Sequence, residues 1–254
     1  MMIETTVNEW NDERNDTMPL SNIRKGISKV LIGQILDLVA TVMTTVASAI
    51  SYGHLNVSEL EGTVDLAYLA EALTVSLIAF TSAILYVTAV ILYIIGLLQA
   101  SKEEVLFRVA LICFCVCVPL RIVSMCFFRQ RFALLHLSET MMTLINMMAL
   151  LYLIQGVRRT ADLLDNKKME KRGDNFFRLI TLICVTEAFG EIAVIIITDT
   201  PAEVITPVIS TLVFCLAIAQ YILLILFLIN VLRMIKKEQA LSEKPADSEM
   251  VSEK

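Results

Sequence analysis

The most prominent feature of the sequence is a series of long apolar runs separated by short polar segments. A helix needs about 20 apolar residues to cross the roughly 30 Å hydrocarbon core of a bilayer. The runs that meet this length are residues 28–50, 73–98, 105–127, 132–155, 179–198 and 206–232. They are continuous rather than alternating, which favours helices over the strands of a membrane barrel. The sequence therefore predicts an all-α, polytopic integral membrane bundle of six transmembrane helices.

Polar segments flank the predicted bundle. We expect residues 1–27 to form a polar N-terminal segment, 28–235 the transmembrane domain and 236–254 a disordered tail, because the last residues, SEKPADSEMVSEK, are polar and charged. Composition supports this division, since 57% of the residues are hydrophobic and the mean hydropathy is +0.72. Such a chain is too apolar for a surface that faces water only. The expected partner is the lipid bilayer, and a formal net charge of -5 gives no reason to expect nucleic acid.

Basic residues gather on one side of the predicted helices. The loops and flanks of that side contain Arg24, Lys25, Lys29, Lys102, Arg108, Arg158, Arg159, Lys167, Lys168, Lys171, Arg172, Arg178, Arg233, Lys236 and Lys237. The opposite loops contain Glu59, Glu61, Asp65, Asp199 and Glu203, with Arg129 and Arg131 as the basic exceptions. Short cytoplasmic loops carry an excess of Lys and Arg. The pattern predicts a plasma or cytoplasmic membrane protein with both termini in the cytoplasm.

Similar segments recur where the predicted helices begin and end. VLFRVALIC at residues 105–113 resembles NFFRLITLIC at residues 175–184, with one residue inserted. The second, fourth and sixth runs end in ILYIIGLLQA, LLYLIQGVRR and ILFLINVLRM. The pattern indicates either three tandem helix hairpins or the convergence of membrane helix ends on similar residues. Repeats in transporters often place a binding site at their shared interface.

Ionisable residues inside the apolar runs are the main candidates for function, because charges are costly in a membrane and usually face a cavity or a partner. They are Asp37, Arg121, His136, Glu139, Glu187 and Glu191. Arg121 and Glu139 lie equally far from the turn expected near Gln130, which predicts an ion pair between them. Asp37 and Glu187 are expected at a similar depth, nearer the basic side.

Three runs carry these residues in polar stripes with helical spacing. The stripes are Gln34, Asp37, Thr41, Thr44 and Ser48; His136, Glu139, Thr143 and Asn146; and Cys184, Glu187 and Glu191. Spacings of three and four keep each stripe on one helix face, so we expect the faces to converge inside the bundle. They form either a polar cavity that binds a cation or proton, or hydrogen bonds that hold helices together.

The excess of acids over bases keeps the cavity open as an interpretation, because one Arg cannot compensate four buried carboxylates. Such a cavity indicates a small-solute or proton- or cation-linked transporter, or a membrane subunit of a transport complex, with a non-catalytic scaffold as the alternative. A Walker A loop is absent, so nucleotide-driven transport would need a partner subunit. The chain is expected to act either with such a partner subunit or as a homo-oligomer.

The cysteines look at first like a metal site, because Cys113, Cys115 and Cys117 lie close together in one run. A helix turns about 100° per residue, which puts Cys115 opposite the other two. We therefore interpret the cysteines as packing residues. We predict no metal and no cofactor.

Two short motifs suggest an enzymatic alternative. Glu103, Glu104 and Arg108 in EEVLFR, with Phe132 and His136 in FALLHL, resemble EE-x-x-x-R and F-x-x-x-H, the first two motifs of the CAAX-type intramembrane proteases. The resemblance covers about 34 residues and implies that Glu103 or Glu104 polarises water while His136 orients the water or the substrate carbonyl.

The rest of the family pattern is not matched. Its third motif, H-x-x-x-N or a variant, is missing. A helical segment between the two motifs would separate Glu104 from His136 by on the order of 25 Å, unless a break at Pro119 folds it back. The alternative is that SKEE is a turn, with Ser101 capping the next helix and acidic residues favoured at its start. We favour the turn, and thus a non-enzymatic protein.

Overall fold

The computed structural model describes residues 20–58, 66–127, 132–164, 166–198 and 205–242. Within these residues the chain forms helices joined by short turns and contains no strand. The helices are α2 (Leu20–Ser58), α3 (Leu66–Ala100), α4 (Val105–Phe127), α5 (Phe132–Leu163), α6 (Lys167–Thr198) and α7 (Ile205–Ser242). The all-α fold class is confirmed.

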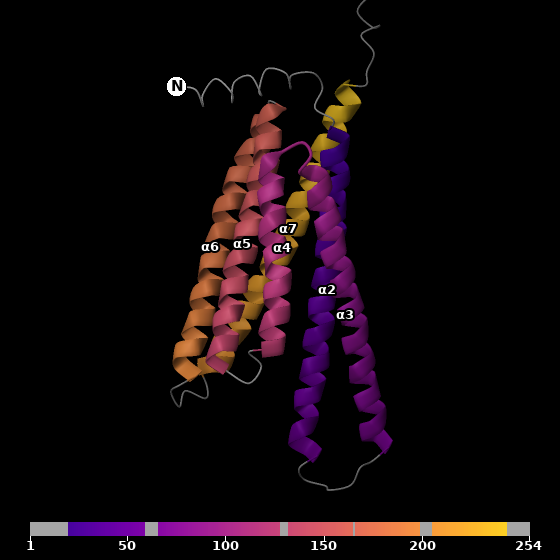
Figure 1. The fold of residues 1–254 in the computed structure, drawn as a ribbon, viewed down its shortest axis with the longest axis vertical. Coiled ribbons are helices and arrows are strands. Elements are labelled where there is room, and N and C mark those ends of the chain that lie inside the picture. Colours follow the sequence, from indigo (N-terminus) through magenta and orange to yellow (C-terminus); the bar gives the residue numbers. More distant parts are fainter. Residues whose placement is uncertain (1–19, 59–65, 128–131, 165, 199–204, 243–254) are drawn as a thin grey trace, which may run out of the picture.

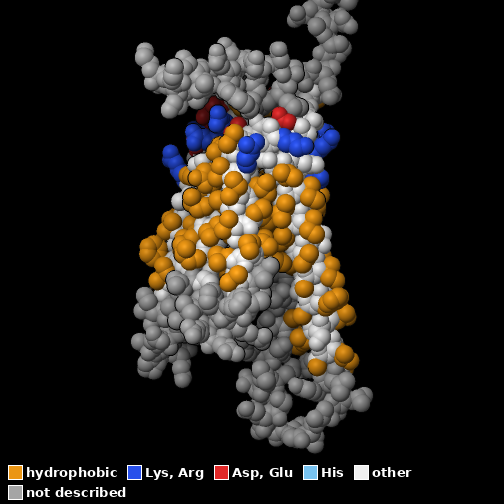
Figure 2. All heavy atoms as spheres, in the orientation of Figure 1, with side chains coloured by type: hydrophobic (Ala, Val, Ile, Leu, Met, Phe, Trp, Pro, Cys, Tyr) orange, Lys and Arg blue, Asp and Glu red, His pale blue; other side chains and the backbone are white. Residues whose placement is uncertain are grey.

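In the described part of the chain, four helices contain segments long and apolar enough to cross a membrane. These segments are Leu20–Ile50, Ala72–Ala100, Thr140–Leu163 and Thr211–Ala240, and α4 contains a shorter apolar segment, Val105–Leu120. Large apolar side chains also point outward, such as Leu77 and Phe80 on α3. Figure 2 shows hydrophobic side chains over the middle of the molecule and a band of Lys and Arg at one end. This distribution suits a protein embedded in a membrane.

The helices extend beyond the predicted membrane spans. Residues 236–242, which we expected to be disordered, belong to α7, so the predicted boundary of the tail is wrong. Tertiary contacts account for the longer helix. Arg24 Nη1 donates to Gln239 Oε1 at 3.0 Å, and Asn166 Nδ2 donates to Glu238 Oε1 at 3.3 Å. These bonds tie the end of α7 to α2 and to the start of α6.

The helices run alternately up and down, so the basic segments meet at one end, which we call the basic end (Figures 1 and 2). Each helix packs against the next one in sequence, and α7 returns to pack against α2. The result is a closed ring of antiparallel neighbours. Side chains from all the helices of this ring can therefore meet at its centre.

The α2–α3 pair is held together by backbone contact. A Cβ atom on Gly26 would lie 2.5 Å from Gly96 O, and one on Gly96 would lie 2.7 Å from Gly26 O. Small buried residues recur every seventh position, with Gly26, Gly33, Ala40 and Ala47 on α2 and Ser82, Ala89 and Gly96 on α3. A seven-residue repeat stays on one helix face, and small residues allow membrane helices to approach closely.

The hydrophobic core occupies the half of the bundle nearer the basic end. Its fully buried side chains include Ile23, Phe107, Ile154, Leu228 and Ile235. The Phe107 ring packs on Gly156, where a Cβ atom would lie 2.9 Å from the ring. Cys184 of the polar stripes belongs to this core, whereas Asp37 and Glu187 lie farther from the basic end. The core therefore closes the bundle on the basic side of the cavity described below.

Candidate functional site

The SKEE segment is a turn between α3 and α4. Ser101 N donates to Leu97 O at 2.8 Å and Ser101 Oγ donates to Leu98 O at 2.9 Å. The prediction that Ser101 caps the following helix is therefore wrong, because its hydroxyl group bonds back to α3. Glu104 takes the capping position instead, since its Oε1 accepts a hydrogen bond from Leu106 N at 3.4 Å.

Both acidic residues of this turn have protein partners. Glu104 is 5% exposed, and its Oε1 lies 3.5 Å from Arg159 Nη1 on α5. Glu103 Oε1 accepts a hydrogen bond from Asn22 Nδ2 on α2 at 2.7 Å. The pair therefore connects α2, the α3–α4 turn and α5 at the basic end.

The structure does not bring the two protease-like motifs together. Glu103, Glu104 and Arg108 lie at the start of α4, and His136 lies near the start of α5. These starts are at opposite ends of the bundle (Figure 1). A break at Pro119 would have joined them, but Pro119 lies inside the continuous helix α4. The His136 side chain is outside the described part of the chain.

A cavity lies between the helices on the far side of the core. It has a larger chamber of about 820 Å³ and a smaller one of about 280 Å³. The chambers share Asp37, Tyr93, Phe114, Thr143, Asn146 and Tyr221, which we call the shared layer. The larger chamber extends from this layer away from the basic end, whereas the smaller chamber extends toward the core. Asp37 therefore lies where the two chambers meet.

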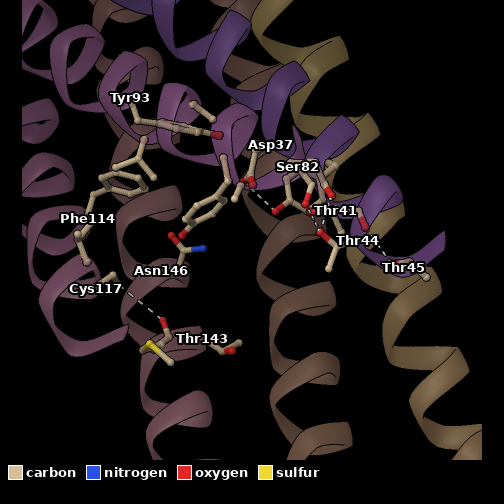
Figure 3. A pocket seen from close by; sticks show the side chains of 18 of the residues that line it. Asp37, Thr41, Thr44, Thr45, Ser82, Tyr93, Phe114, Cys117, Thr143 and Asn146 are labelled. Carbon is tan, nitrogen blue, oxygen red and sulfur yellow. Dashed lines mark hydrogen bonds between the residues drawn. The ribbon is translucent and has the colours of Figure 1, made fainter. Parts of the chain in front are cut away.

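The larger chamber has one hydroxyl-rich wall and one aromatic wall. Figure 3 shows Tyr93 and Phe114 on one side, Thr41, Thr44 and Ser82 on the other, and Asp37 between them. Thr44 Oγ1 lies 2.9 Å from Ala40 O and 3.2 Å from Ser82 Oγ. The hydroxyl groups thus satisfy each other and the helix backbone.

Each of the two carboxylates is held by a neutral side chain of α7. Tyr221 donates its hydroxyl hydrogen to Asp37 Oδ2 at 2.9 Å. Glu187 is 7% exposed. In the amide orientation that satisfies both partners, Gln220 Nε2 donates to the two carboxylate oxygens of Glu187 at 3.0 and 3.2 Å. Consecutive residues of α7 therefore connect a carboxylate of α2 with one of α6.

The described lining of the cavity is acidic. Asp37 and Glu187 line the smaller chamber, and the described residues around both chambers include no Lys, Arg or His. Burial of a carboxylate in a low-dielectric site costs free energy unless the charge is balanced. The cavity is therefore better suited to a cation than to an anion.

Some polar groups of the lining make no hydrogen bond within the described part of the chain, and Gln34 and Tyr93 are two of them. Gln34 is 5% exposed and faces the smaller chamber, and Tyr93 belongs to the shared layer. Buried amides and hydroxyl groups usually have a partner. These groups are therefore available to a molecule inside the cavity.

The structure thus places two of the predicted intramembrane residues, Asp37 and Glu187, in one cavity. The side chains of Arg121, His136, Glu139 and Glu191 lie outside the described residues, and the Arg121–Glu139 ion pair stays a prediction. Sequence reasoning missed Tyr93, Gln220 and Tyr221 because it considered mainly ionisable groups. A usable signal exists, since Tyr86 and Tyr93 are seven residues apart, and this spacing keeps both on one face of an apolar helix.

The cysteines have different environments. Cys115 is exposed, Cys113 and Cys117 are half-buried, and Cys184 is buried. Cys115 therefore faces away from the other two of its run, in agreement with the helical geometry. No group of three His, Cys, Asp or Glu side chains that could hold a metal ion occurs among the described residues.

Comparison of the chain with protein-family models, curated proteins and solved structures found no significant match.

Proposed function

We propose that the protein is a membrane transporter, or the membrane subunit of a transport complex, in which a cation or proton binds at Asp37 and Glu187 together with a small solute. The observation that carries this proposal is the pair of carboxylates in a cavity whose described lining contains no basic residue. Ionisable residues inside a membrane bundle commonly mark ion or substrate paths.

The proposed topology has six membrane spans and both termini in the cytoplasm. The six proposed spans are the four helices with long apolar segments together with α4 and α6. They form three helix hairpins, each of which enters and leaves the membrane at the basic end. The concentration of Lys and Arg at this end supports its cytoplasmic location. The larger chamber then extends toward the outer side, and the hydrophobic core closes the cytoplasmic side.

Helix α7 is proposed to couple binding at the two carboxylates to the rearrangement of the helices. A cation at Asp37 competes with the Tyr221 hydroxyl for the carboxylate, and a cation at Glu187 competes with Gln220. Because Gln220 and Tyr221 are adjacent, release of one carboxylate shifts the helix segment that holds the other. Such a shift links occupation of the cavity to rearrangement of α7 against α2 and α6, as alternating access requires.

The test is ion flux in proteoliposomes that contain the full-length protein. Proton and sodium gradients are applied, and internal pH and sodium are followed with fluorescent dyes. We expect flux above that of protein-free liposomes, reduced about tenfold or more in Asp37→Asn and Glu187→Gln, because loss of a buried charged partner costs about 2–5 kcal/mol. Asp162→Asn is the control, since Asp162 is exposed at the basic end of α5. Wild-type flux equal to that of empty liposomes overturns the proposal.

A further inference from the structure

Within the described residues, five aromatic side chains line the larger chamber. Tyr86, Tyr93, Phe114, Phe214 and Tyr221 line this chamber together with Asp37. The ring centroids of Tyr93 and Phe114 are 5.0 Å apart with an interplanar angle of 31°, so the two rings form one wall. Figure 3 shows this wall beside Asp37.

A carboxylate and an aromatic wall in the same chamber restrict the class of ligand that fits. A bare inorganic cation or a proton uses the oxygen atoms of the chamber but gains nothing from its aromatic wall. A neutral apolar solute gains nothing from a buried carboxylate, whose desolvation it cannot offset. An organic ammonium ion uses both features, because its charge pairs with a carboxylate and its alkyl groups rest on the electron-rich faces of aromatic rings.

The volume of the larger chamber agrees with an organic ion. A chamber of about 820 Å³ has the size of pockets that enclose small organic molecules, about 300–1,000 Å³. The space therefore exceeds what a dehydrated metal ion occupies.

We propose that the larger chamber binds an organic ammonium ion, with Asp37 as its counter-ion and the Tyr93–Phe114 wall as its aromatic contact. This inference rests on the proposed transport function and names the class of the solute. The ammonium group lies at Asp37 and displaces the Tyr221 hydroxyl from the carboxylate. The organic part of the ion fills the chamber on the side away from the basic end.

The test is binding of radiolabelled benzyltrimethylammonium to the full-length protein in nanodiscs, measured by equilibrium dialysis against protein-free nanodiscs. The probe carries a permanent positive charge and one aromatic ring. We expect saturable binding by the wild type and affinity about tenfold or more weaker in Asp37→Asn. Tyr93→Leu removes the aromatic face and weakens binding about 5- to 30-fold, whereas Tyr93→Phe keeps the face and binds nearly as well as the wild type.

The control variant is Phe80→Leu, because Phe80 is 66% exposed on the outer face of α3. It removes an aromatic ring from the protein without changing the chamber, so binding is expected to stay at the wild-type level. Size-exclusion elution and thermal stability are compared for every variant. If Asp37→Asn does not fold, the comparison of Tyr93→Leu with Tyr93→Phe still tests the aromatic contact.

The outcomes separate the two proposals. Ion flux without saturable binding of the probe overturns the organic-cation inference and leaves the transport proposal standing. If neither ion flux nor saturable binding of the probe is found, both the transport proposal and the organic-cation inference are overturned. Saturable binding that is equally strong in the wild type, Asp37→Asn and Tyr93→Leu places the probe elsewhere and also overturns the inference.

Discussion

The Tyr221 hydroxyl donates a 2.9 Å hydrogen bond to Asp37 Oδ2 and so joins α7 to α2 at the meeting point of the two chambers. The bond closes the ring of helices at its first and last described members. The preceding residue, Gln220, bonds Glu187 on α6. One segment of α7 therefore positions both carboxylates of the cavity.

The Tyr221–Asp37 bond is expected to contribute to stability. Tyr221→Phe removes the donor and lowers the free energy of unfolding by about 0.5–2 kcal/mol, the range of hydrogen bonds between membrane helices. Unfolding is followed by circular dichroism in mixed micelles as the denaturing detergent is increased. A double-mutant cycle with Asp37→Asn measures the coupling between the two side chains.

Tyr152→Phe is the control for Tyr221→Phe, because it also removes a tyrosine hydroxyl group. Tyr152 packs against the core, and its hydroxyl makes no hydrogen bond within the described residues. Its replacement is expected to change stability by less than about 0.5 kcal/mol. Equal losses in Tyr221→Phe and Tyr152→Phe, or a coupling energy near zero, would contradict the role assigned to the bond.

The closest approach of two helix backbones is predicted to tolerate no side chain. Gly26→Ala places a methyl group 2.5 Å from Gly96 O and 2.9 Å from Ala100 N, and neither backbone atom can move alone. We expect a loss of about 1–3 kcal/mol, seen as a lower midpoint in thermal unfolding of the purified protein. Gly173→Ala is the matched control, because its methyl group meets no atom closer than 3.5 Å. Similar midpoints for the two variants would show that α2 and α3 are not packed this closely.

The Glu104–Arg159 pair is predicted to respond unequally to loss of either partner. Glu104 is buried, whereas the Arg159 side chain is 57% exposed. Arg159→Ala leaves a buried carboxylate without its counter-charge and is expected to cost about 1–3 kcal/mol. Glu104→Gln leaves Arg159 in contact with water and keeps an acceptor for Leu106 N, so its cost is expected to be below about 1 kcal/mol.

Arg158→Ala is the control for Arg159→Ala. Arg158 Nη1 lies 3.0 Å from Asp174 Oδ1, and both side chains are partly exposed. Exposed pairs contribute about 0–1 kcal/mol, so the loss is expected to be small in the same unfolding assay. A larger loss in Arg158→Ala than in Arg159→Ala would refute the importance of burial at Glu104.

The proposed topology predicts which loops a membrane-impermeant maleimide reaches in intact cells. Single cysteines are introduced after the native cysteines have been replaced. Gly62→Cys, Gln130→Cys and Ala202→Cys, each between helices that meet away from the basic end, are expected to react without permeabilisation. Lys102→Cys and Lys168→Cys at the basic end are expected to react only after the cells have been permeabilised. Protection of Gln130→Cys or Ala202→Cys in intact cells would exclude the six-span arrangement.

Helix class and the location of the basic end were predictable because both depend on residues close together in sequence. Apolar runs identify segments that satisfy their own backbone hydrogen bonds in lipid, and Lys and Arg mark the ends of these runs. The stripe around Asp37 was likewise visible from the spacing along one helix. The tail boundary was missed because the last turns of α7 depend on contacts with Arg24 and Asn166.

The sequence by itself determined that the chain is helical, that it is suited to a membrane and that Asp37 and Glu187 lie on polar faces. Only the tertiary structure decided that these faces share one cavity, that Tyr221 and Gln220 hold the two carboxylates, and that Gly26 meets Gly96. The physical reason is the distance along the sequence over which each effect acts. Hydropathy and helical spacing act over a few residues, whereas the register between helices distant in sequence is set by packing of the whole ring.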